Sequence, residues 1–287
     1  MDASRSIALS QRDDGIVVLT FDQPGSKANV LSPKVWTDFA NALAEAKSLS
    51  SIRGLIVASA KPGIFIAGAD LKVIGAATAP NDPAVRELIE QGLRVLETLE
   101  AFPVPTVAAI DGAALGGGLE VALACDFRVV GSHPKCNLGL PEVTLGLIPG
   151  WGGTQRLPRI VGLAHAVEML TTAQSIPASR AIEISLVDAA FSSETLLDSA
   201  SNLVLTRDST ARRSIKSSLI PDAIRWAFKA PVADRPTAVR TAILVMEEGA
   251  ALPLADAIPI ETTAFLRLAG SEESHRMIEA FFNRKKA

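Results

Sequence analysis

The sequence predicts an α/β core followed by a helical C-terminal region. Over roughly the first 200 residues, short β-rich apolar runs alternate with amphipathic helical patterns. This alternation is typical of buried strands covered by helices. From about residue 164 the chain is rich in alanine and helix-forming residues and has almost no strand signal. We therefore divide it into a core of residues 1–200 and a helical region of residues 201–287.

The first elements each have a local signature. Residues 16–21, Ile-Val-Val-Leu-Thr-Phe, form a β-rich run that ends in a turn signal. Ser32 and Pro33 then open a helix as N-cap and first helical residue. Residues 52–58 predict a short apolar strand. A long helix is expected over residues 84–101, where apolar side chains recur at helical spacing.

Later elements flank a glycine-rich turn. Residues 104–110 predict a strand that leads into the run Gly116-Gly-Gly-Leu-Glu120, and the apolar residues after the glycines predict a helix. Residues 127–130 predict the next strand. In the C-terminal region we expect prolines to divide the chain into short helices, namely Pro221, Pro231, Pro236, Pro253 and Pro259.

Composition excludes several classes of protein. With 287 residues and 48% hydrophobic content the chain can bury a large core, and its net charge of −3 offers no basic field for nucleic acid or an anionic membrane. It has neither a signal-peptide pattern nor an apolar run near the roughly 18–20 residues that span a bilayer. Cys125 and Cys136 lack metal spacing and are expected as free thiols. We therefore expect a cytoplasmic protein without a membrane span.

The glycine run supplies the strongest functional signal. Backbone N–H groups at Gly116–Gly118 would lie bare at a positive helix end, which suits developing negative charge. Glu120 follows in the first turn of an otherwise apolar helix, and Glu142 follows Pro141 after a further loop. Singly, these residues could be a tight turn, a solvated helix residue and a helix-start residue. Together, anion donors and two carboxylates are typical of a catalytic site.

Other motifs are excluded by their spacing. Residues 112–118 do not fit the dinucleotide pattern G-x-G-x-x-G, and residues 150–154 lack the lysine of a P-loop. The three histidines stand apart from any nucleophile motif, so we expect surface or packing roles for His133, His165 and His275. No spacing of His, Cys or carboxylate residues favours a metal site.

Three segments carry a family resemblance: 65–71 (Phe-Ile-Ala-Gly-Ala-Asp-Leu), 111–120 (Asp-Gly-Ala-Ala-Leu-Gly-Gly-Gly-Leu-Glu) and 140–157, which begins Leu-Pro-Glu-Val. With them the chain resembles the crotonase (enoyl-CoA hydratase/isomerase) superfamily along nearly its whole length. Three more stretches, 24–29, 59–63 and 236–240, resemble the N-terminal hydratase part of multifunctional fatty-acid oxidation complex α subunits. Nothing resembles the dehydrogenase that follows there, so we expect a free-standing hydratase or a piece of a longer polypeptide.

The resemblance implies a particular architecture and set of partners. It implies a spiral of repeated ββα turns, with a helical C-terminal region that serves oligomerisation and closes the substrate pocket. A homotrimer, or a hexamer formed as a dimer of trimers, is expected. A thiolase or dehydrogenase partner is implied if the chain is part of an oxidation complex. The implied substrate is an acyl-CoA thioester, and no cofactor is expected beyond its coenzyme A.

The resemblance also implies roles for individual residues. The N–H groups of Ala69 and Gly117 would form the oxyanion hole, Glu120 would activate the water, and Glu142 would protonate C2. Substrate and coenzyme A would be bound by Lys27, Ala28, Ala67, Gly68, Asp70, Leu71, Lys72, Phe281 and Arg284. Arginine at 284 replaces the family's usual lysine. Trp151 stands where smaller residues are common, so we expect it to shorten or redirect the acyl channel.

These expectations favour an enoyl-CoA hydratase that acts on trans-2-enoyl-CoA thioesters in fatty-acid β-oxidation. One alternative is a Δ3,Δ2-enoyl-CoA isomerase that uses Glu142 alone. Another is the hydratase fragment of a multifunctional 3-hydroxyacyl-CoA dehydrogenase. A third is a crotonase-like binding protein such as a scaffold or an RNA binder. The acidic charge disfavours RNA, and the intact glutamate pair, Glu120 and Glu142, disfavours a protein without activity.

Overall fold

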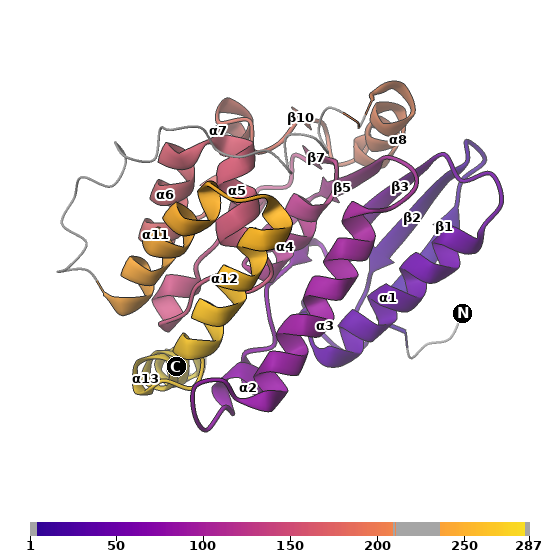
Figure 1. Ribbon diagram of the computed structural model, residues 1–287. Helices are drawn as coiled ribbons and strands as arrows, with labels where there is room; N and C mark the ends of the chain where they lie inside the picture. The colour runs from indigo at the N-terminus through magenta and orange to yellow at the C-terminus, as the bar shows by residue number, and fades with distance from the viewer. Residues whose placement is uncertain (1–4, 209, 211–235, 285–287) are drawn as a thin grey trace.

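Two sheets form the centre of the molecule (Figure 1). The computed structural model describes residues 5–208, 210 and 236–284. The larger sheet has the order β1 (Ile7–Gln11), β2 (Ile16–Phe21), β3 (Gly54–Ser59), β5 (Thr106–Ile110), β7 (Phe127–Val130) and β10 (Ala189–Ala190). The smaller has the order β4 (Gly63–Ile66), β6 (Gly112–Leu115), β8 (Asn137–Gly139) and β9 (Ile176–Pro177). Only the β1–β2 and β8–β9 pairs are antiparallel among these strands.

Three successive ββα units build both sheets at once. The first strand of each unit lies in the larger sheet and the second in the smaller, giving β3–β4, β5–β6 and β7–β8. The helices that close the units are α3 (Pro83–Glu100, preceded by the short α2, Leu71–Gly75), α4 (Gly117–Ala124) and α5 (Gly153–Val161, preceded by the 3-10 turn η1, Glu142–Leu145). The expected ββα spiral is confirmed. Because β4, β6 and β8 are parallel, their carboxyl ends meet at one edge.

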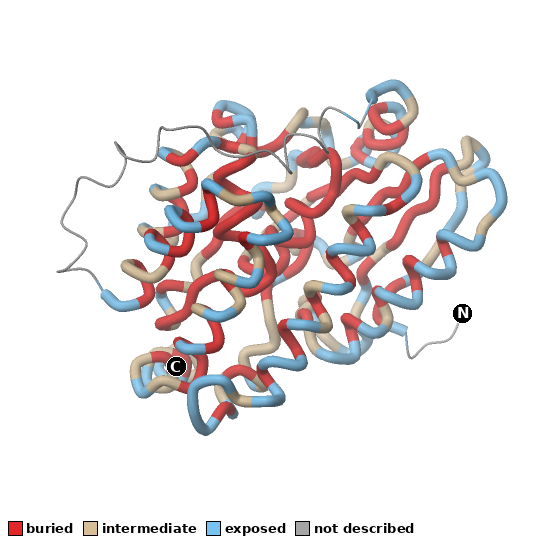
Figure 2. The backbone as a smooth tube through the Cα atoms, viewed as in Figure 1, coloured by how far each residue is buried: buried red, intermediate tan, exposed pale blue. Residues whose placement is uncertain are grey.

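Helices cover both faces of the larger sheet, so its inner strands β2, β3, β5 and β7 are buried along nearly their whole length (Figure 2). On one face α1 (Pro33–Ser48) lies beside α3, and it begins as expected with Ser32, whose hydroxyl accepts a hydrogen bond from the Val35 N–H. On the other face α8 (Leu196–Thr206) packs on β3, β5 and β7. Alternate residues of β2 serve the two faces, since Val17 and Ile16 belong to different core clusters.

The C-terminal helices return to the core. They follow α6 (Leu163–Thr172) and α7 (Ala178–Glu183) and comprise α11 (Thr237–Ala250), α12 (Leu254–Leu268) and α13 (Glu272–Arg284). α12 packs against α11, α5 and α3, and α13 packs on α2 and η1. The expectation that Pro259 ends a helix is wrong, because it lies inside α12. A proline removes one helical hydrogen bond and crowds the carbonyl one turn earlier, and the packing of α12 on three helices offsets this cost so that the helix continues. Pro221 and Pro231 lie outside the described residues.

Most of the expected elements are present with small boundary shifts. The strands at residues 16–21 and 127–130 have the predicted bounds, and the expected helix 84–101 is α3. Strands β4, β6 and β8 and the short α2 were not predicted. None of the helices in the described part of the chain is long and apolar enough to cross a membrane.

Candidate active site

The three parallel strand ends of the smaller sheet converge on one cavity. Its volume is about 380 Å³, and its polar lining comes from the chain just after β4, β6 and β8. Ala69 follows β4, Gly117 begins α4 directly after β6, and Glu142 begins η1 after β8. Glu120, one helical turn beyond Gly117, lines the same cavity. The ββα repeat thus brings together four residues that the sequence singles out.

Glu120 is held firmly at the base of this cavity. Every residue of α4 is buried, and Glu120 itself is only 1% exposed. Its Oε1 accepts hydrogen bonds from the N–H groups of Trp151 at 2.7 Å and Gly153 at 2.8 Å. Two donors on one oxygen fix the carboxyl and leave the other oxygen, Oε2, for a bound water or substrate. Glu120 is therefore not an ordinary solvated helix residue.

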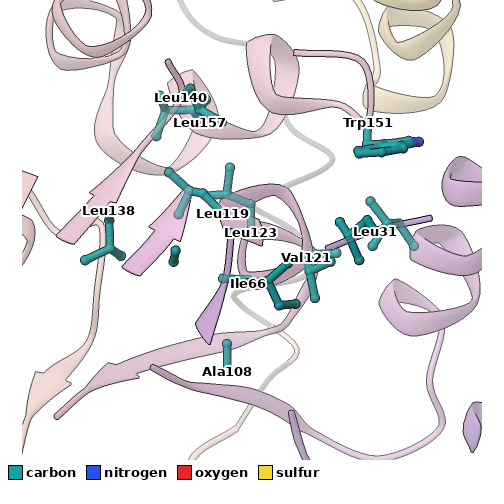
Figure 3. Packing of buried hydrophobic residues seen from close by; sticks show 14 of the residues in the cluster. Leu31, Ile66, Ala108, Leu119, Val121, Leu123, Leu138, Leu140, Trp151 and Leu157 are labelled. Carbon is teal, nitrogen blue, oxygen red and sulfur yellow. The ribbon is translucent and has the colours of Figure 1, made fainter. Parts of the chain in front are cut away.

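Figure 3 shows apolar side chains that anchor α4 in the core. The apolar side chains Leu119, Val121 and Leu123 spread from the helix into the surrounding core, and all three are fully buried. Because the helix is apolar on all sides, it cannot rotate to expose Glu120 without exposing one of them. Burial of the whole helix thus fixes the direction of its one carboxylate.

The carboxyl of Glu142 is held by fewer hydrogen bonds than that of Glu120. Its Oε2 is buried and has no hydrogen-bond partner among the described residues. Gly116 lies directly behind it, with a positive φ of 54° that favours glycine. The free oxygen on the cavity wall is therefore available to a ligand.

Burial sets the protonation of both carboxyls. It raises the pKa of Glu120 well above its usual range, and the charges of Glu261 and Glu142 raise that pKa further, against the N–H groups of Gly153 and Trp151. Burial also raises the pKa of Glu142 to about 8, again with a contribution from Glu261. A carboxyl with a pKa near 8 keeps its proton at neutral pH and can donate it. Glu120 accepts two amide hydrogen bonds whereas Glu142 Oε2 accepts none, so when the pair gives up one proton these donors favour the charge on Glu120 and leave the proton on Glu142.

The structure adds a third carboxylate that the sequence analysis missed. Glu261 of α12 is fully buried and accepts hydrogen bonds from the N–H groups of Gly152 and Thr154 and from the Thr154 hydroxyl. Burial raises its pKa to about 7, although these donors and Arg156 act in the opposite direction. A signal was present, because Glu261 continues the buried i, i+4 line of Ala257 and Phe265.

Two backbone N–H groups face the cavity without acceptors. Within the described residues neither Ala69 nor Gly117 donates its N–H to another group, while neighbouring amides are used. The Leu31 N–H donates to the Gly68 carbonyl and the Asp70 N–H donates to the Leu31 carbonyl, so Ala69 is held in place with its own N–H spare. Gly117 is the first residue of α4, where the helix leaves its N–H unpaired. Two such donors on one cavity can hold an anionic oxygen.

The residues expected to bind substrate and coenzyme A divide into two groups. Ala67, Gly68, Leu71 and Phe281 line the cavity. The others lie outside its lining: Lys27, Ala28, Asp70, Lys72 and Arg284.

Local contacts place the members of this second group. The Asp70 side chain caps α2 by accepting from the Lys72 N–H. Lys27 and Ala28 precede Asn29, whose carbonyl accepts from the Ala67 N–H, so the two predicted segments are neighbours.

An indole forms the apolar wall of the cavity. Trp151 is 2% exposed, its ring packs edge-on against Trp36 with centroids 5.0 Å apart, and its Nε1–H donates to the Ile89 carbonyl at 3.2 Å. The cavity is otherwise walled by aliphatic and aromatic side chains that include Ile74, Ile89 and Phe265. Such a wall suits an apolar chain.

The described part of the chain has no candidate metal site, and no histidine lines this cavity. Among the residues that the structure describes, no group of three or more His, Cys, Asp or Glu side chains could hold a metal ion. None of the three histidines lines the cavity. Cys125 and Cys136 are buried free thiols.

Comparisons with known proteins give a consistent result. The model of the family "Enoyl-CoA hydratase/isomerase" matches residues 11–242. A fatty acid oxidation complex subunit alpha from Shewanella halifaxensis is 36% identical over 98% of this chain. The chain spans only 41% of that relative's length.

Solved structures agree with the sequence comparisons. An enoyl-CoA hydratase from Bacillus anthracis is 30% identical, with a TM-score of 0.64 over 98% of this chain and 97% of the other. The human mitochondrial delta3-delta2-enoyl-CoA isomerase has a TM-score of 0.72 at 22% identity, over 98% of both chains. At that identity the second likeness shows the fold alone.

Proposed function

The chain belongs to the enoyl-CoA hydratase/isomerase family, and on that premise we propose that it adds water across the trans-2 double bond of enoyl-CoA thioesters. The observation that carries the proposal is the pairing of Glu120 and Glu142 on one cavity that also holds two unpaired backbone N–H groups. Hydration of a conjugated thioester needs each of these parts. It needs no cofactor beyond the coenzyme A of the substrate.

The two N–H groups would stabilise the charge that builds on the thioester oxygen. As water attacks C3, electron density moves through C2 to that oxygen and forms an enolate. Ala69 and Gly117 would each donate to it from the chain just after the neighbouring parallel strands β4 and β6. Losing one such donor typically costs about 2.7–4 kcal/mol of transition-state stabilisation.

The two glutamates would divide the proton transfers. Ionised Glu120 holds the water with its free oxygen and takes one proton as the oxygen–C3 bond forms. Protonated Glu142 delivers a proton to C2 and becomes ionised, so the enolate collapses to the 3-hydroxyacyl thioester. The amides of Trp151 and Gly153 favour the charge on Glu120, and the buried, unpaired Oε2 of Glu142 favours a proton there.

A steady-state panel of trans-2-enoyl-CoA thioesters from short to long chain tests the proposal. Loss of the conjugated enoyl absorbance should be accompanied by formation of the 3-hydroxyacyl-CoA product. Negligible rates at every chain length would overturn it and would favour the crotonase-like binding protein. The panel also gives the preferred acyl length.

A Δ3,Δ2-enoyl-CoA isomerase is the second candidate. The buried Oε2 of Glu142 has no partner among the described residues, so this carboxyl could carry a proton between C2 and C4. Such a reaction does not require a water held by Glu120. A dedicated isomerase should therefore keep most of its rate in the Glu120→Gln variant.

The cellular setting is part of the proposal. The 36% identity to an oxidation complex α subunit supports a role in fatty-acid β-oxidation. It also supports a thiolase or a dehydrogenase as partner, and the hydratase part of a multifunctional 3-hydroxyacyl-CoA dehydrogenase as an alternative context. Two buried free thiols are compatible with a reducing cytoplasm.

We further propose a homotrimer or hexamer. Leu244 of α11 is 55% exposed and lies in a groove between α11 and α12, together with Ile260 and Ala264. Burying this apolar groove against a second copy would stabilise an assembly. Light scattering of the purified protein should give three or six copies, and a monomer at micromolar concentration would contradict the expectation.

A further inference from the structure

The turn before α5 and the first two residues of α5 form one segment, called the Trp151–Thr154 loop below, whose alternate amides bind two buried carboxylates. Residues Trp151 to Thr154 present successive N–H groups to opposite sides. Trp151 and Gly153 donate to Glu120 at 2.7 and 2.8 Å. The Gly152 N–H, which lies between them, donates to Glu261 at 2.5 Å, and the Thr154 N–H donates to it at 2.8 Å. The position of one carboxylate is therefore linked to the other through four consecutive residues.

The loop has little freedom apart from these bonds. Gly152 adopts a left-handed conformation with φ of 92°, which favours glycine. Arg156 donates from Nη1 to the Trp151 carbonyl and is itself held by two hydrogen bonds of 2.8 Å to Glu100. The carbonyl side of the loop is thus fixed by an arginine, while its amide side depends on Glu261 and Glu120.

We propose that Glu261 is a positioning residue for the proposed hydration, which holds the Trp151–Thr154 loop so that its other two amides fix Glu120. Glu261 does not line the cavity, so it acts through the loop and not on the substrate. The inference rests on the proposed function for its rate measurements. It gives the C-terminal helix α12 a part in the chemistry, although Glu261 is 107 residues from Thr154 along the chain.

The negative charge of Glu261 has a second effect through space. It raises the pKa of both Glu120 and Glu142. The cation whose charge acts on this group is Arg156 of α5, which is paired with Glu100 of α3. The Arg159 guanidinium of α5 instead donates to the carbonyls of Gly249 and Leu252, and on α11 Glu247 and Glu248 are exposed. Removing the Glu261 charge should therefore lower the pKa of both site carboxyls.

The Glu261→Gln variant separates positioning from mere stability. Glutamine keeps the volume but has only one acceptor oxygen, so one loop amide loses its partner. Misplacement of Glu120 should lower kcat by about 10–100-fold with KM changed less than about threefold. The limb set by Glu142 should move to lower pH, because the charge of Glu261 raises that pKa and the loop amides do not act on it. A purely structural role would lower the melting temperature without moving either limb.

Two further variants sharpen the result. Glu261→Asp keeps the charge but shortens the arm, so kcat should fall while the limbs stay in place. Asp256→Asn removes a carboxylate from an exposed position of the same helix and should match the wild type. If Glu261→Gln does not fold, the kcat of Glu261→Asp tests the positioning role. A wild-type kcat in either Glu261 variant overturns the inference.

A readout independent of turnover separates this inference from the proposed function. Infrared difference spectra over a pH series report the protonated-carboxyl band directly. The part of the band that belongs to Glu142, identified by its loss in Glu142→Gln, should titrate at lower pH in Glu261→Gln than in the wild type, whether or not the wild type hydrates enoyl-CoA. An unshifted band overturns the inference alone, whereas an inactive wild type with a shifted band overturns only the hydratase.

Discussion

Gly116 and Glu142 meet so closely that a Cβ on Gly116 would lie 2.8 Å from Glu142 Oε1. The two residues are 26 positions apart in the chain and follow the ends of β6 and β8, and their contact fixes where the second carboxyl lies. An absent side chain thus makes room for the carboxyl that we propose as the acid. The first of the glycines is needed for this fit as well as for its backbone conformation.

Gly116→Ala should therefore displace Glu142 and strain the turn at φ of 54°. We expect a loss of about 10²-fold in kcat for hydration, since small displacements of a catalytic group carry penalties of that size. Circular dichroism should show an intact fold with a lowered melting temperature. Hydration within threefold of the wild type would contradict the proposed fit.

Ala69→Pro tests the oxyanion donor. The Ala69 N–H bonds no described group, whereas its neighbours Gly68 and Asp70 make the contacts to Leu31 through a carbonyl and an N–H that proline leaves in place. Removing the N–H should lower kcat by about 10²–10³-fold, as for other lost oxyanion donors. The melting temperature serves as the control for folding. A folded Ala69→Pro variant with wild-type kcat would assign the donor elsewhere.

Glu142→Gln should change how stability depends on pH. Folding raises the pKa of this carboxyl from about 4.3 in the unfolded chain to about 8. Its contribution to folding is thus fully present below about pH 4.3 and is lost as the pH rises towards 8. The variant should gain melting temperature relative to the wild type at pH 8 but not at pH 5. Glu97→Gln, at an exposed site of α3, is the matched control. An equal difference at both pH values would contradict the raised pKa.

Trp151→Leu should lengthen the acyl cavity. The indole contributes to the cavity wall between Gly117 and α3, and its backbone N–H, which binds Glu120, is kept in the variant. Each extra methylene that becomes buried is worth about 0.8 kcal/mol, so kcat/KM should rise several-fold per added methylene for long substrates relative to short ones. Trp36→Phe is the control, because Trp36 packs on the indole but does not line the cavity. A uniform loss across chain lengths would assign Trp151 a structural role only.

The helices and strands that could be predicted are those whose own residues carry a strong local signal. Strand β2 has a run of β-branched and aromatic residues, and Ser32 with Pro33 marks a helix start. Strand β6, Gly-Ala-Ala-Leu, has no such signal. It is a strand because it lies between β4 and β8, so only the pairing of distant segments reveals it.

The residues of the site likewise divide into those with a local sequence signal and one without. Glu120 and Glu142 stand beside glycine and proline in motifs that can be found locally. Glu261 is found only by noting that a carboxylate continues the buried line of α12. Even then no local pattern indicates that it reaches Gly152 and Thr154, since a helix period gives the buried face but not its neighbour.

The central claim is that Glu120 and Glu142 act together to hydrate trans-2-enoyl-CoA. The most direct measurement compares the hydration rates of the wild type, Glu120→Gln and Glu142→Gln on one trans-2-enoyl-CoA, with product identified as 3-hydroxyacyl-CoA. We predict that the wild type hydrates it and that each variant loses about 10²–10⁴-fold in kcat as a general acid or base is removed. A wild type without hydration, or a Glu120→Gln variant that hydrates at the wild-type rate, would contradict the account.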